Sequence, residues 1–214
     1  MLNYVCKHGG IMSKISMNVS NFIPKEVAIK NVEMNHQEVL NVIKNPEVEL
    51  FDEPTYAILR DFEFENGIIE VKVFSRLLKD APDFARGFIG IAFHINQENS
   101  EFEGIYIRPT NSKVKDQMRR NRSTQYFSYP NYKFDVLRQT DPIKYESYVD
   151  IDIQEWIDFK VIVLNESAEL FINNAPQPCL VVTDLKLGKR KGSIALWSEV
   201  GTDAYFKDLV VTKF

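Results

Sequence analysis

Short runs of alternating apolar and polar residues recur along this chain of 214 residues and constrain its fold more than any other feature. Residues 68–74 alternate directly after Asn66-Gly67, and both residues of that dipeptide tolerate positive φ, which makes it a strong turn signal. Period 2 is the spacing of a strand with one buried face. Further strands of this kind are expected at residues 88–95, 102–108, 156–164, 168–172, 180–182, 192–197 and 205–214.

The order of these segments predicts the fold class. Nine Pro and nine Gly are scattered between short apolar runs, and the short connections favour antiparallel neighbours. The sequence therefore predicts an all-β protein, a two-sheet antiparallel jelly-roll sandwich of roughly a dozen strands. Residues 21–214 are expected to form a single sandwich domain. Residues 1–20, which are polar and contain several Asn and Ser, are expected to be a flexible N-terminal segment.

Residues 35–43 fit two structures. Residues 35–38 have the spacing of a helix capping box, and apolar residues follow at helical spacing as far as Ile43. Residues 38–43 equally fit a strand, and Pro46 would end either element. The local pattern does not decide between them.

Bulk properties exclude several classes of protein. The net charge of −4 argues against a nucleic-acid partner, and no run approaches the roughly 20 apolar residues that span a bilayer. The N-terminus lacks the apolar core of a secretory signal, so a cytoplasmic location is the default expectation. Cys6 and Cys179 form no metal-binding motif and are expected to be free thiols.

From residue 62 onward, an ordered set of motifs carries a resemblance to a known family. The motifs lie at residues 64–71, 90–93, 103–109, 155–156, 168–174, 192–197 and 204–209. In this order they resemble the concanavalin A-like lectin/glucanase superfamily, especially its laminin-G-like members and its 3-keto-disaccharide hydrolase domains. The resemblance implies a jelly-roll sandwich, favours a strand at 38–43, and implies a carbohydrate partner. It does not imply one activity, because the superfamily includes lectins, hydrolases and inert spacers.

Residues 150–155 superficially resemble the catalytic strand of laminarinase-type glucanases. A retaining glycosidase needs two carboxyls about 5–5.5 Å apart, which one strand face can supply. Here Asp150 stands where that strand has Glu, and the polar Gln154 replaces an apolar residue. Asp150 and Asp152 also suit Ca²⁺ as hard oxygen ligands, although two carboxylates are few for a calcium site. The alternative is a solvated strand end.

Residues 113–134 concentrate cations and aromatic rings. Five Lys or Arg fall within ten residues, and five Tyr or Phe follow. Aromatic faces stack on sugar rings, and Arg forks hold hydroxyls or carboxylates in pairs. We interpret the segment as a long insertion, which in a sandwich is more often functional than a short turn. A solvated loop and single-stranded nucleic-acid binding are the alternatives.

These patterns lead to a hypothesis of a concave groove that binds a glycan or glycoside. The candidate ligand-binding residues are His94, Tyr106, Arg108, Arg119, Arg122, Gln125, Tyr126, Tyr129 and Trp197. The candidate catalytic carboxyls are Glu70, Glu103 and Glu146.

Three classes of function fit such a groove. Two carboxyls converging in it would indicate a glycoside hydrolase-like enzyme. Arg and aromatic side chains without such a pair would indicate a binding module. A groove filled by its own side chains would indicate a non-catalytic structural or interaction domain of laminin-G type. Whether the chain is an enzyme stays open at this point.

Overall fold

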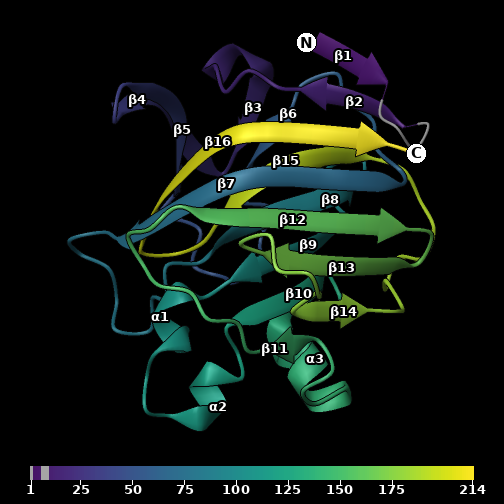
Figure 1. The fold of residues 1–214 in the computed structure, drawn as a ribbon. Coiled ribbons are helices and arrows are strands. Elements are labelled where there is room, and N and C mark those ends of the chain that lie inside the picture. The colour runs from purple at the N-terminus through teal and green to yellow at the C-terminus, as the bar shows by residue number, and fades with distance from the viewer. Residues whose placement is uncertain (1, 6–9) are drawn as a thin grey trace.

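The computed structural model describes residues 2–5 and 10–214, and Cys6 lies outside them. Two antiparallel sheets stack face to face (Figure 1). The first sheet runs in the order β1 (Leu2–Val5), β2 (Ile11–Lys14), β16 (Thr202–Lys213), β7 (Gly67–Leu77), β12 (Ile157–Leu164), β13 (Ser167–Ile172) and β14 (Leu180–Val182). The hairpin of β4 (Val27–Met34) and β5 (Gln37–Lys44) joins this sheet by pairing with β16.

The second sheet has seven strands. Its order is β11 (Glu146–Ser147), β10 (Thr124–Tyr129), β9 (Phe102–Ile107), β8 (Ile89–Ile95), β15 (Ser193–Ser198), β6 (Tyr56–Leu59) and β3 (Phe22–Lys25). The short helices α1 (Pro109–Ser112), α2 (Gln117–Arg120) and α3 (Phe134–Thr140) lie together at the β10–β11 side of the sandwich (Figure 1). A 3-10 turn at Val19–Asn21 precedes β3. The predicted all-β, two-sheet jelly-roll sandwich is confirmed.

The core lies between the two sheets. Ile69 and Val71 of β7 face inward from one sheet, and Ile91, Ile105 and Leu196 face them from the other, all of them at most 3% exposed. Each such side chain stabilises the fold by about 1.5–3 kcal/mol relative to leaving it in water. Period-2 alternation in the sequence therefore translates directly into this shared core.

Residues 37–44 form strand β5, so the strand expected at 38–43 is confirmed and the helix is not formed. Asn35 and His36 have φ values of 51° and 61° and make the tight turn of the β4–β5 hairpin. Val39, Leu40 and Val42 are fully buried, and β5 pairs with β4 on one side and with β16 on the other. Tertiary contact thus overrides the local capping-box signal.

Part of the N-terminal segment belongs to the first sheet. Strand β2 pairs with residues 210–213 of β16, and Ile15 and Met17 are buried. Residues 11–17, expected in the loose terminus, are therefore paired and packed. The domain boundary near residue 20 stays a prediction.

The segment 113–134 is not one long insertion, which corrects the sequence-based interpretation. Its basic half contains α2, but its aromatic half is strand β10, between β9 and β11. Tyr126 and Phe127 point to opposite faces of that strand and are both fully buried. The aromatic residues are dense there because both faces of β10 are covered.

The outer face of the seven-stranded sheet is lined with aromatic rings. The Tyr106 ring stacks on Trp197 with 4.7 Å between centroids, and Phe127 packs against both. Gly90 lies opposite Tyr106 and Trp197, and its lack of a side chain leaves room for this stack. The middle of this face is therefore filled by the protein's own side chains, and a cavity lies at one end of it.

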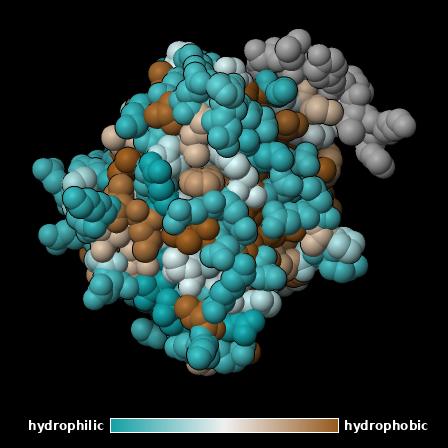
Figure 2. Space-filling view, turned by 60° about the vertical axis from the view of Figure 1, so that its left-hand side comes forward, coloured by the Kyte–Doolittle hydropathy of each residue, from teal (hydrophilic) through white to brown (hydrophobic). Residues whose placement is uncertain are grey.

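Among the described residues, none of the helices is both long and apolar enough to cross a membrane. On the face that Figure 2 shows, hydrophobic residues form separate groups among hydrophilic ones.

Candidate functional site: an arginine-lined cavity

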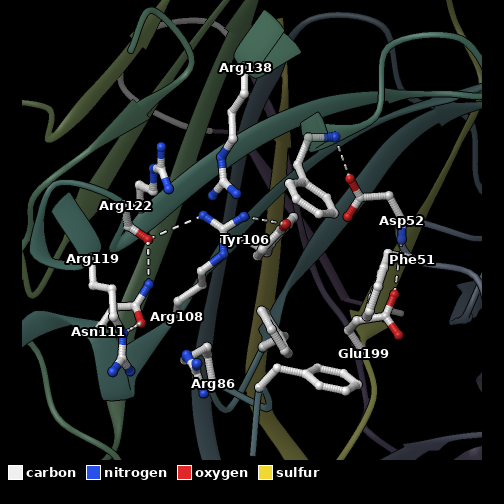
Figure 3. A pocket seen from close by; sticks show the side chains of 13 residues that line it. Phe51, Asp52, Arg86, Tyr106, Arg108, Asn111, Arg119, Arg122, Arg138 and Glu199 are labelled. Carbon is white, nitrogen blue, oxygen red and sulfur yellow. Dashed lines mark hydrogen bonds between the residues drawn. The ribbon is translucent and has the colours of Figure 1, made fainter. Parts of the chain in front are cut away.

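A cavity of about 490 Å³ lies where β9, α2, α3 and the loops before β6 and β8 meet (Figure 3). Its wall combines guanidinium, aromatic and carboxyl side chains. The lining residues are Phe51, Asp52, Phe84, Arg86, Phe88, Tyr106, Arg108, Asn111, Arg119, Arg122, Phe134, Arg138 and Glu199.

Arg108 is fixed at the centre of the wall. It follows β9 directly and is only 4% exposed. Its Nη2 donates to Tyr106 Oη at 2.8 Å and to Gln125 Oε1 at 3.0 Å, and its Nη1 donates to Glu146 Oε1 at 3.2 Å. Neighbours on β9, β10 and β11 therefore hold this guanidinium in one orientation.

Glu146 is the counter-ion of three arginines. Besides Arg108, its carboxylate accepts hydrogen bonds from Arg138 Nε at 3.0 and 3.1 Å and lies 3.4 Å from Arg122 Nε. The Glu146 side chain is only 5% exposed. With both oxygens engaged by guanidiniums, this carboxylate orders the basic wall and has no free oxygen directed at the cavity.

Asp52 supplies a carboxyl with an unusual pKa. Burial raises the pKa of Asp52 from 3.8 to about 7, and the neighbouring Glu199 carboxylate adds to the rise. The Phe134 N–H donates to Asp52 Oδ2 at 2.7 Å. This hydrogen bond and the positive charge of Arg108 both oppose the rise in the pKa of Asp52. Asp52 has a φ of 53°, a left-handed conformation that Asp tolerates better than most residues.

Glu199 lies beside Asp52 and is engaged by other groups. It forms a buried ion pair with Lys44 of β5. Its Oε2 accepts the Asp52 N–H at 3.0 Å, and its Oε1 accepts the Val200 N–H at 2.7 Å. Burial raises the pKa of Glu199, whereas Lys44 lowers it. Figure 3 shows both acids on the side of the cavity opposite Arg119 and Arg122.

Exposed aromatic rings form the rim of the cavity. Phe51 and Phe84 are 37% and 49% exposed and meet edge to face, with 5.6 Å between centroids. Phe51 also contacts the Phe134 ring at 6.0 Å. Rings left this exposed contribute little to the core, so they are free to contact a ligand.

The structure brings some of the candidate binding residues together. Tyr106, Arg108, Arg119 and Arg122 all line the cavity, and Gln125 lies behind Arg108 as its hydrogen-bond partner. Their convergence follows from the end of β9, the start of β10 and α2 lying side by side.

The remaining binding candidates do not line this cavity. Trp197 is buried under Tyr106, and its Nε1 donates to Glu53 O. His94 is fully buried, and its Nε2 lies 2.8 Å from Glu65 O. Tyr126 faces the core, and Tyr129 stacks on Phe102.

The three candidate catalytic carboxyls are not brought together. Glu70 is exposed on β7, in the other sheet. Glu103 is fully buried and accepts hydrogen bonds from Tyr126 Oη and the Leu187 N–H. Glu146 is held by arginines, as described above. The carboxyls that do meet at the cavity are Asp52 and Glu199.

Residues 150–155 lie in a turn rather than in a strand, so the glucanase-like pattern is not formed. Asp152 pairs with Lys113 at 3.1 Å, and its N–H donates to Glu155. In the part of the chain that the structure describes, no group of three or more His, Cys, Asp or Glu could hold a metal ion. Binding of Ca²⁺ by Asp150 and Asp152 stays a prediction.

Nine of the thirteen residues that line the cavity were not among the candidates from the sequence. Asp52, Phe84 and Arg86 lie in loops, and Arg138 and Glu199 follow in distant parts of the chain. One signal was available: the loops before β6 and β8 each carry an apolar ring beside a charge. Loops disproportionately carry binding residues, so these two loops are candidates for a site.

No family model matches the sequence, and no curated protein matches it. Solved structures do match. The carbohydrate-binding module CBM66 from Bacillus subtilis aligns over 87% of this chain and 94% of its own, with a TM-score of 0.54 and 8% identity. A Bacillus subtilis protein of unknown function with a galectin-like fold aligns over 91% and 90%, with a TM-score of 0.55 and 12% identity.

The chain therefore has a concanavalin A-like fold, a jelly-roll sandwich shared with these two structures. At these identities the likeness concerns the fold alone, and membership of the concanavalin A-like superfamily, or of its laminin-G-like branch, stays a prediction. In this concanavalin A-like sandwich the cavity lies at one end of the seven-stranded sheet, beside α2 and α3.

Proposed function

We propose that this concanavalin A-like sandwich binds a carbohydrate in the arginine-lined cavity. One observation carries the proposal: the cavity combines exposed aromatic rings at its rim with fixed guanidiniums in its wall. An aromatic ring such as Phe84 can pack on the apolar face of a sugar ring, and an Arg guanidinium can donate paired hydrogen bonds to the polar groups at the edge of the sugar ring. The fold shared with a carbohydrate-binding module agrees with this proposal.

The rim provides the test. Phe84→Ala removes an exposed ring and should leave folding intact, but it should weaken glycan binding about tenfold. A glycan array would first identify a ligand, and isothermal titration calorimetry would then compare the variants. Phe214→Ala is the matched control, because Phe214 is 60% exposed and does not line the cavity. If the protein retained no glycan at millimolar concentration, the proposal would fail in favour of an interaction domain of laminin-G type.

A second candidate, hydrolysis of the bound glycoside, is favoured by Asp52. A carboxyl whose pKa lies near the ambient pH can donate a proton to a leaving oxygen. Asp52→Asn keeps an acceptor for the Phe134 N–H, so binding should persist while release of reducing ends falls at least about a hundredfold. Unchanged turnover would remove Asp52 from candidacy. If the unaltered protein hydrolysed no glycoside, hydrolysis would be ruled out and the proposal of a carbohydrate-binding module would remain.

A further inference from the structure

Two guanidiniums of the cavity wall have only neutral hydrogen-bond partners. Among the residues that the structure describes, neither Arg86 nor Arg119 has a carboxylate within ion-pair distance. Arg86 Nη1 donates to the backbone oxygens of Asp83 at 2.6 Å and Ala85 at 2.7 Å. Arg119 Nε donates to Asn111 Oδ1 at 3.3 Å. These contacts position the two side chains and leave their positive charges uncompensated.

The two positive charges also act on each other. Burial lowers the pKa of Arg86, and the charges of Arg119 and Arg108 lower it further, which places the three guanidiniums within electrostatic reach. The Asp83 carboxylate opposes this shift, as the smallest of the contributions. Like charges held this close destabilise the empty cavity, and a bound anion would remove that cost.

The rest of the wall does not neutralise them. Arg108, Arg122 and Arg138 share the single carboxylate of Glu146. Glu199 is paired with Lys44, on the far side of the cavity, and the pKa of Asp52 beside it is raised to about 7, so Asp52 carries only part of a negative charge near neutral pH. The cavity is therefore locally basic, although the whole chain carries a net charge of −4.

We infer that the cavity selects a sugar bearing an anionic group, which binds between Arg86 and Arg119. This inference rests on the proposed function and specifies its substrate class. The anionic group is a carboxylate, as in a uronic acid, or a sulfate ester, since guanidinium forks bind either through paired hydrogen bonds. Phe84 lies two residues from Arg86 in the same loop, so one sugar ring can reach both the aromatic rim and the basic wall.

Calorimetry with three sets of oligosaccharides tests the inference. The probes are oligogalacturonides, which carry carboxylates, sulfated galactan oligosaccharides, and neutral cello-oligosaccharides of matched length. One acidic set should bind at least about tenfold more tightly than the neutral set, and added salt should weaken that binding. The acidic set that binds more tightly identifies the anionic group.

The helix α2 supplies a matched pair of variants. Arg119→Gln should weaken binding of the acidic oligosaccharide about tenfold and change binding of any neutral one less than about twofold. Arg120→Gln makes the same charge change at the next residue, where the guanidinium lies over the Tyr148 ring and outside the cavity. It should leave the affinity unchanged. Circular dichroism would verify that both variants are folded.

The outcomes separate this inference from the proposed function. Neutral oligosaccharides binding as tightly as acidic ones would overturn the anion selectivity and leave carbohydrate binding intact. Equal losses in Arg119→Gln and Arg120→Gln would also overturn it, because the effect would then be one of net charge. If none of the oligosaccharides bound while inorganic sulfate bound and Arg119→Gln abolished that binding, the anion site would stand and the carbohydrate proposal would fail.

Discussion

Asp52 makes the stability of this protein depend on pH near neutrality. Its pKa is about 7 in the folded protein against 3.8 for an exposed carboxyl, so the folded state holds the proton more tightly than the unfolded state. The corresponding contribution to stability is fully present below about pH 4 and is lost as the pH rises to about 7. Asp52→Asn mimics the protonated carboxyl and cannot lose a proton.

Urea unfolding at several pH values tests whether the contribution of Asp52 to stability falls as the pH rises. The variant Asp52→Asn should gain stability relative to the unaltered protein as the pH rises from about 4 to 7, and the difference should then level off. A difference between Asp52→Asn and the unaltered protein that did not change with pH would show that Asp52 does not titrate in this range.

The candidate site could be predicted from the sequence only in part. Arg119 and Arg122 are predicted by the density of cations at residues 113–122, and Arg108 is predicted because it shares a strand face with Tyr106. Asp52 and Arg86 were not found, because isolated loop residues give no periodic signal and meet only when the loops before β6 and β8 converge. Burial of a carboxyl beside a cavity is a property of the folded surroundings, which no local pattern contains.

At the scale of elements, the pairing of β8 with β9 depends on Gly90. A Cβ at this position would lie 2.2 Å from Ile105 O and 2.6 Å from Tyr106 Cα, both backbone atoms of the neighbouring strand. Gly90→Ala should therefore destabilise the protein by about 2–4 kcal/mol and disturb the Tyr106–Trp197 stack. Urea unfolding followed by Trp fluorescence measures both effects. If Gly90→Ala were as stable as the unaltered protein, β8 and β9 would accommodate the added Cβ without loss of stability, and the prediction would be wrong.

Elements were predicted well where period 2 was clear and poorly where two signals competed. The strands around residues 68–74 and 168–172 stand where alternation placed them. Strand β10 was not predicted. Its residues are buried on both faces, which removes the alternation of apolar and polar residues, and the charged residues that precede it resemble a loop. The local pattern at residues 38–43 fitted both a helix and a strand. The resemblance carried by the order of the motifs favoured the strand, which is the element that forms.

For the whole molecule, we propose that the two sheets unfold as one unit because they share one core. Trp156 packs on Phe74 of the first sheet, and Trp197 lies in the second. In Trp156→Phe, Trp197 is the single remaining Trp and reports its own sheet. Its fluorescence midpoint in urea should coincide with the midpoint from far-UV circular dichroism, which reports both sheets. Separate midpoints would divide the sandwich into two units.

The wall of the cavity is assembled from widely separated parts of the chain: Asp52, Arg86, Arg119, Phe134 and Glu199 come from five different connections or helices. No unfolded chain presents them together, so an occupant binds the native state alone. By thermodynamic linkage, a ligand at a hundredfold excess over its Kd adds about 2.7 kcal/mol to the free energy of unfolding. The melting temperature thus becomes a sensor of occupancy, and unlabelled compounds of unknown identity can be screened by heating the protein.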